Sequence, residues 1–237
     1  MRTLRIAILG LASLLSVGCS VPHRVPPSAP AGSATTAVPP AGAEGRAGVR
    51  RLQVVPAESE VLVRVYRAGP FATLGHNHVI LWHPVGWVEQ AADLPGSRFE
   101  LDIDLAQAEI DDARRRAAEG ADFPGEIPPS AREGTARNML GDALLDAARH
   151  PRLNIRSVSI SGQGAPSARV AVQVAGRESL LEVPFRLVGD SQLIASGEFS
   201  LTQSQLGLKP FSVMLGALQV QDEMRVRFRL VARAVNP

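Results

Sequence analysis

The chain has 237 residues and a formal charge of only +2 at pH 7. A charge this small does not indicate a general nucleic-acid-binding surface, so no nucleic-acid partner is expected. The single cysteine excludes a disulfide within the chain.

The first eighteen residues have the pattern of a secretory signal peptide. Two arginines precede an apolar run over residues 6–15, which is too short to cross a bilayer, and small residues follow it. Cys19 directly follows Gly18 and resembles the modified cysteine of bacterial lipoproteins, although Ser16 stands where their motif prefers leucine. That resemblance implies removal of residues 1–18 and a periplasmic lipoprotein anchored in a bacterial membrane through acylated Cys19. The alternative is a plain secretory signal with an incidental cysteine.

Residues 19–50 are rich in Pro, Ala and Gly and contain no aromatic residue. Such a segment cannot bury enough apolar surface to offset its conformational entropy, so we expect a disordered tether. Its prolines favour extended conformations, which would hold a folded domain away from the membrane surface. The remaining residues, 51–237, are long enough for one domain with a substantial core.

Strand periodicity dominates residues 51–237. Within residues 98–106, Phe99, Leu101 and Ile103 point one way while the acidic residues between them point the other. The same alternation recurs at residues 61–65, 170–174, 181–187, 193–201 and 224–230. Alternation of this kind is typical of an antiparallel sheet with one solvated face. A shift of the apolar phase around Ser157 predicts a β-bulge that bends its strand.

One interval breaks the strand pattern. Ser130 and Glu133 stand at capping-box spacing, and helix formers follow as far as Gly141 and again as far as Pro151. We therefore expect two short helices here. The charged and proline-rich residues before them predict a long loop with one helical turn, in which the basic run 114–116 forms a solvated face.

The chain lacks the sequence motifs of several enzyme classes. It has no G-x-S-x-G elbow, no H-E-x-x-H helix, no Walker-type glycine loop and no dinucleotide-binding fingerprint. Asp102 and Asp104 could suggest paired catalytic carboxylates, but they belong to the polar face of an amphipathic strand. Arg225, Arg227 and Arg229 alternate with apolar residues, so they too indicate an outer, solvated face.

Four segments between residues 52 and 232 are similar to one known family. They are an apolar strand with a central Gly-His, the helical stretch 138–157, the hairpin 170–188 and the C-terminal segment 197–232. Together they resemble the YceI-like family of bacterial periplasmic lipid-binding proteins. The most specific part is the run from Leu144 to Pro151, which has His150 where the family usually has an aromatic residue.

The resemblance implies an all-β fold, namely a lipocalin-like antiparallel β-barrel with a short helical insertion, around a tunnel for a long isoprenoid chain. It implies a bound polyisoprenoid or similar lipid and no cofactor. The hairpin segment 174–185 departs from the threonine-rich segment of many members, so the outer sheet should differ in detail. Because aromatic residues make up only 4% of the chain, the lining should be mainly aliphatic, which suits a flexible chain better than a planar cofactor.

The inward-facing side chains of such a barrel are the candidate ligand contacts. They are Phe99, Leu101, Ile103, Val183, Phe185, Phe199, Val226 and Phe228. All are apolar and none is a candidate catalytic residue, so the protein is expected to bind a lipid and to catalyse no reaction. The alternative is that the same side chains fill the barrel as a solid core.

Three of the five histidines lie close together, at positions 76, 78 and 83. On a strand, His76 and His78 share one face and could bind one ion, whereas His83 lies on the other face. Two imidazoles make an incomplete zinc site, which normally has three or four protein ligands. We favour buried hydrogen bonds or a place at the barrel mouth for these side chains. The alternative is a metal- or haem-binding redox or hydrolytic protein that uses His76 and His78.

Overall fold

The computed structural model describes residues 48–162 and 165–234. The expected signal peptide 1–18, Cys19 and nearly all of the expected tether 19–50 lie outside these residues. No helix in the described ranges combines the length and the hydropathy that a membrane span requires.

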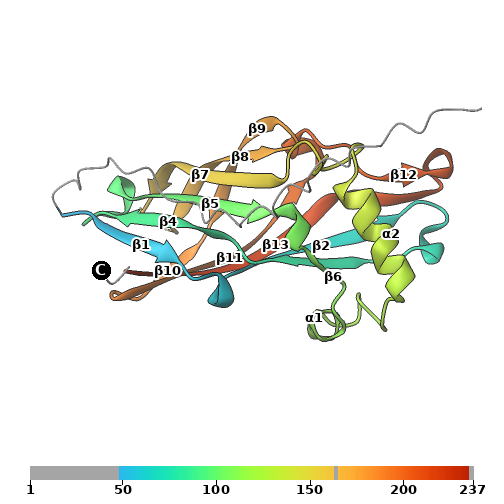
Figure 1. Ribbon diagram of the computed structural model, residues 1–237, viewed down its shortest axis with the longest axis horizontal. Helices are drawn as coiled ribbons and strands as arrows, with labels where there is room; N and C mark the ends of the chain where they lie inside the picture. The colour runs from blue at the N-terminus through green and yellow to red at the C-terminus, as the bar shows by residue number, and fades with distance from the viewer. Residues whose placement is uncertain (1–47, 163–164, 235–237) are drawn as a thin grey trace, which may run out of the picture. The chain divides into compact units, whose positions relative to one another are not determined.

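Thirteen strands of the described residues form one antiparallel sheet (Figure 1). The first six are β1 (Arg50–Val54), β2 (Glu60–Ala68), β3 (His78–Trp82), β4 (Val85–Gln90), β5 (Arg98–Asp104) and β6 (Glu109–Ile110). The others are β7 (Arg152–Ser161), β8 (Ser167–Val174), β9 (Arg177–Pro184), β10 (Arg186–Val188), β11 (Gln192–Thr202), β12 (Ser212–Val213) and β13 (Leu218–Ala234).

The helical segments of the described residues are short. Two α-helices, α1 (Ala113–Ala118) and α2 (Pro129–Leu140), lie between β6 and β7. Single 3-10 turns are η1 (Pro56–Glu58), η2 (Ala72–Leu74), η3 (Leu94–Gly96), η4 (Leu105–Gln107), η5 (Ser204–Leu206) and η6 (Met214–Gly216). The helical insertion into an otherwise β structure is therefore as expected.

The long strand β13 organises the sheet. It pairs with β2 and β1 along one edge and with β11 along the other. From β1 the hydrogen-bonded ladder continues through β4, β5, β7 and β8 to β9. Strand β9 is followed directly by β10, which pairs with β11, so the strands surround an interior (Figure 1).

The ladder is interrupted between β9 and β11, where Pro184 and Gly197 lie close together. Pro184, the last residue of β9, has no N–H to donate to a neighbouring strand. Gly197 of β11 lies so close that an added Cβ atom would be 2.5 Å from the Pro184 carbonyl oxygen. The sheet is therefore not closed by hydrogen bonds here, and β9 is joined to β10 only by the covalent turn at Phe185.

The expected bulge is confirmed in β7. The pairing between β7 and β8 shifts register between Ser157 and Ser159, and the Ser157 hydroxyl accepts a hydrogen bond from the Phe99 amide at 2.9 Å. A second shift interrupts the pairing of β13 with β2 between Val220 and Met224. Such irregularities increase local bending, which a sheet needs in order to curl around an interior.

The helical insertion differs from the expectation in two respects. Helix α2 begins at Pro129 and no side chain caps its N-terminus, so the capping box expected at Ser130 and Glu133 is wrong. Proline fits the first helical position because its φ is preset and its missing N–H would be unpaired there. The second expected helix is also wrong, because Asp146 takes a left-handed conformation (φ 49°) and residues 141–150 form turns.

Leu145 packs the helical insertion against the barrel interior. We predict that Leu145→Ala lowers the free energy of unfolding by about 2–5 kcal/mol. The side chain is buried within the main apolar cluster, together with Met139 of α2. Chemical denaturation gives the measurement. Leu180→Ala is the matched control, because Leu180 is 51% exposed, and its change should be much smaller. Equal effects of the two substitutions would place Leu145 outside the core.

Candidate functional site

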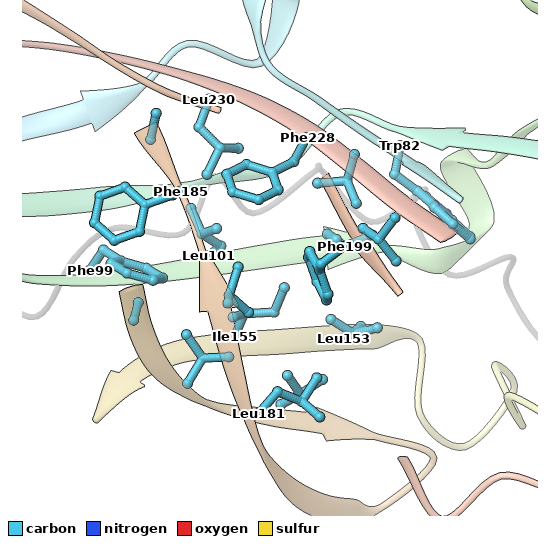
Figure 2. Close-up of a pocket in the computed structure, with 18 of the residues that line it drawn as sticks. Trp82, Phe99, Leu101, Leu153, Ile155, Leu181, Phe185, Phe199, Phe228 and Leu230 are labelled. Carbon is cyan, nitrogen blue, oxygen red and sulfur yellow. The ribbon is translucent and has the colours of Figure 1, made fainter. Parts of the chain in front are cut away.

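A cavity of about 530 Å³ occupies the interior of the curled sheet. We call it the larger cavity, to distinguish it from a smaller neighbour of about 150 Å³. All eight side chains predicted to face inward line this larger cavity: Phe99, Leu101, Ile103, Val183, Phe185, Phe199, Val226 and Phe228. Figure 2 shows five of them, namely Phe99, Leu101, Phe185, Phe199 and Phe228. Strand alternation explains this placement, since every second residue of a strand points to the same face. The structure therefore leaves room between side chains that could have filled the barrel as a solid core.

Three phenylalanine rings line the larger cavity. The rings of Phe199 and Phe228 come from the paired strands β11 and β13 and meet edge to face, with centroids 6.4 Å apart. Phe185 occupies the turn between β9 and β10, and its ring points into the same space (Figure 2). All three rings line the cavity, and the rings of Phe199 and Phe228 also pack against each other.

Several lining residues were missed as site residues. They include Val61, Val63, Val65, Trp82, Leu153, Ile155, Val170, Val172, Val174, Leu181 and Leu230. The period-2 alternation of their segments was visible in the sequence and could have identified most of them. What the sequence does not show is which of the alternating faces borders open space.

The lining of the larger cavity is almost entirely apolar. No charged side chain of the described ranges lines it, and its polar side chains are limited to Gln90, Ser97 and Gln203, besides the indole of Trp82. Burial of apolar surface contributes about 25 cal/mol per Å², without directional requirements. This arrangement can hold a flexible apolar chain and offers no group for acid–base chemistry.

Trp82 lines the larger cavity and can serve as an intrinsic fluorescence reporter of it. Its side chain is buried in the lining, and its Nε1 atom has no hydrogen-bond partner within the described structure. Trp87 is the only other tryptophan of the chain, and it does not line this cavity; its ring lies beneath the guanidinium of Arg51, 5.1 Å from the ring centre.

A smaller cavity of about 150 Å³ adjoins the larger one. The two share a wall formed by Val65, Ile80, Met139, Leu144 and Gln203. Besides this shared wall, the smaller cavity is lined by the polar side chains of Arg67, His76, His78, Thr135, Asn138 and Gln219. A ligand could therefore place an apolar chain in one cavity and a polar group in the other.

His78 is held from behind by a buried carboxylate. Its Nδ1 atom lies 2.6 Å from Asp111 Oδ2, while Asp111 Oδ1 accepts hydrogen bonds from the Val79 amide at 3.0 Å and from Arg116 Nη1 at 2.7 Å. Asp111 is fully buried and has a left-handed backbone conformation, with φ of 53°. Such strain in a buried polar residue is found most often where the surrounding structure fixes a functional group.

The expectation that the basic run 114–116 forms a solvated face is wrong for Arg116. Arg114 is exposed, but Arg116 is only 1% exposed and also donates to the carbonyl oxygen of Asn77 at 2.7 Å. Helix α1 contacts β3, and this packing turns the arginine inward. A buried arginine needs a counter-charge, and Asp111 provides it.

The surroundings set the charge states of these groups. Burial raises the pKa of Asp111, but His78, the Val79 amide and Arg116 together lower it more, so the pKa lies below its ordinary value. Partial burial lowers the pKa of His76, and the charges of His78 and Arg116 lower it further. At neutral pH, Asp111 is therefore ionised and His76 is neutral.

The three clustered histidines do not converge on one point. The rings of His76 and His78 are edge to face with centroids 6.4 Å apart, whereas His83 lies elsewhere and hydrogen-bonds the Ser59 carbonyl at 2.8 Å. Across residues 48–162 and 165–234, no group of three or more His, Cys, Asp or Glu side chains is arranged to hold a metal ion. His78 and Ile80 border the smaller cavity, and Ile80 and Trp82 the larger one, as strand alternation predicts.

No family model and no curated protein matches the chain. Solved structures do match, among them BcnA of Burkholderia cenocepacia, with a TM-score of 0.54 and 15% identity over 75% of this chain and 98% of BcnA. The described domain has the fold of BcnA. The expected fold class, a lipocalin-like antiparallel barrel with a helical insertion, is thereby confirmed.

Two further structures match with lower scores than BcnA. A polyisoprenoid binding domain from Saccharophagus degradans, implicated in plant cell wall breakdown, has a TM-score of 0.49 and 10% identity, over 79% of this chain and 99% of that domain. A mutant of the YCEI protein of Campylobacter jejuni has a TM-score of 0.46 and 8% identity, over 65% of this chain and 82% of that protein.

Proposed function

We propose that this BcnA-like domain is a non-enzymatic, YceI-like binding protein that holds a long apolar chain, a polyisoprenoid or related lipid, in the larger cavity. The observation that carries the proposal is the lining of that cavity, which is apolar almost throughout and includes no charged side chain from the described residues. A cavity of about 530 Å³ falls within the usual size range of small-molecule sites.

The energetics fit a chain ligand. Each buried methylene contributes about 0.8 kcal/mol, and micromolar affinity requires about 8 kcal/mol. On the order of ten methylenes inside the larger cavity would therefore suffice, before the cost of ordering the chain. A flexible hydrocarbon meets this requirement without any specific polar contact.

The proposal can be tested with Trp82 as the reporter. In a Trp87→Phe variant, Trp82 is the only tryptophan left, and farnesol entering the larger cavity should change its emission in a saturable manner. Delipidated protein is titrated with farnesol, and the Trp82→Phe variant with Trp87 intact is the control. An unchanged Trp82 signal throughout the titration would contradict the proposal.

We further propose that residues 1–18 are a lipoprotein signal peptide and that residues 19–50 tether the domain 51–237 to the periplasmic side of a membrane. The support is the sequence pattern around Cys19. Cys19→Ser should yield a soluble periplasmic form or an uncleaved precursor, because no thiol remains to be acylated. Fractionation of cell envelopes gives the result, with Ser20→Ala as the control. Equal membrane association of Cys19→Ser and the wild type would refute the anchor.

A further inference from the structure

The polar walls of the smaller cavity have a one-sided charge. They include one arginine, Arg67, and two histidines, of which His76 is neutral at neutral pH, and within the described residues no aspartate or glutamate lines this cavity. The uncharged polar groups are those of Thr135 and Asn138 on α2 and of two glutamines. A cavity with this composition favours a negatively charged group over a positively charged one.

Arg67 is available to such a group. Its Nη1 atom donates to the Gly75 carbonyl at 2.7 Å, which fixes the side chain without neutralising it. The buried and half-buried arginines nearby are paired with carboxylates, as Arg64 and Arg227 are with Glu119. Among the described residues, Arg67 has no such ion pair. Its guanidinium can therefore form charge-assisted hydrogen bonds with a ligand oxygen.

His78 is oriented for the same purpose. Because Nδ1 is engaged by Asp111, only the Nε2 edge of the ring remains available to the smaller cavity. The carboxylate behind the ring would ordinarily repel an anion. Here the ion pair with Arg116, at 2.7 Å, cancels that charge while the imidazole stays fixed. With Nδ1–H directed at Asp111, Nε2 can donate to a ligand oxygen when the imidazole carries its second proton, and the triad adds no net negative charge behind it.

We propose that the smaller cavity binds the anionic head group, a carboxylate or a phosphate, of the lipid whose chain lies in the larger cavity. This inference rests on the proposed function and narrows the ligand class to single-chain amphiphiles with a terminal anion. The two cavities are adjacent, since Val65, Ile80 and Met139 line both, and the proposal requires the chain of one molecule to pass between these side chains. At about 150 Å³, the smaller cavity has room for one small head group.

Matched ligand pairs test the proposal. Delipidated Trp87→Phe protein is titrated with farnesol and farnesyl monophosphate, and separately with hexadecanol and palmitate, while Trp82 emission is followed. The anionic member of at least one pair should bind about tenfold more tightly than its alcohol, with the advantage shrinking as salt is raised. The two pairs distinguish a prenyl phosphate from a fatty acid. Equal affinity within both pairs overturns the head-group assignment and leaves the proposed function intact, whereas failure of all four ligands to bind overturns both.

Substitutions place the preference in the smaller cavity. Arg67→Gln and His78→Gln should each remove most of the preference for the anion while leaving affinity for the alcohol unchanged. Arg67 is exposed, so its replacement does not endanger folding and keeps the test decisive if His78→Gln is unstable. Arg156→Gln is the control, since Arg156 pairs with Glu178 on the outer surface. Full retention of the preference in Arg67→Gln would refute the site.

Discussion

Replacing Ile103 with tryptophan should abolish retention of a long-chain lipid while the domain remains folded. Ile103 is only 3% exposed and points from β5 into the larger cavity. The indole would occupy the space that the chain requires, and because that space is open, the cost in stability should not exceed the roughly 1–3 kcal/mol typical of overpacked cores. Retention of tritiated farnesol through gel filtration measures the effect, and circular dichroism reports the fold.

The control for this substitution adds the same side chain outside the barrel. Leu180 of β9 is 51% exposed and does not line the larger cavity, so Leu180→Trp should retain farnesol as the wild type does. If folded Ile103→Trp protein also retained farnesol fully, the ligand would not occupy the part of the interior that Ile103 borders.

Asp111→Asn should lower the free energy of unfolding by about 3–5 kcal/mol, because it leaves Arg116 buried without a counter-charge. The amide can still accept one hydrogen bond, but it cannot balance the guanidinium and fix His78 at the same time. Urea denaturation at neutral pH measures the change. Glu178→Gln is the control, since it breaks an exposed ion pair with Arg156 and should have a much smaller effect.

The pH dependence of stability provides a second readout for Asp111. Its pKa is lower in the folded protein than in the unfolded chain, so the unfolded chain binds the proton more readily. The stabilisation is complete above the unfolded pKa and is lost as pH falls through the lowered folded value. The Asp111→Asn variant should lack this component of acid destabilisation. An acid denaturation profile of the same shape in variant and wild type would contradict the role of Asp111.

The antiparallel strands and their apolar face were predictable because strand alternation is a local property, whereas the barrel was implied by the resemblance to the YceI-like family. A period of two residues fixes which side chains share a face, so Phe99, Leu101 and Ile103 could be assigned to one side before the fold was known. The same rule explains why His78, Ile80 and Trp82 lie on one face of β3. The interruption between β9 and β11 was not predicted, since it lies where Pro184 of β9 and Gly197 of β11 come into contact in the fold.

The predictions that were wrong concern features that tertiary contacts decide. Arg116 stands in a run of three arginines, and only the packing of α1 against β3 brings it to Asp111. Asp111 and His78 are 33 residues apart, and nothing in the sequence pairs them. The residues after Gly141 favour a helix, but Asp146 adopts a left-handed conformation and Leu145 is drawn into the core. The lining of the smaller cavity therefore could not be derived from the sequence.

The central claim is that the larger cavity of this protein holds a lipid chain. The most direct measurement is native mass spectrometry of the full-length protein purified from its own membranes, followed by mass spectrometry of an organic extract of the same sample. We predict about one long-chain lipid per protein, bearing a carboxylate or phosphate if the smaller cavity acts as proposed. Protein that is fully folded and carries no extractable long-chain lipid would contradict the account.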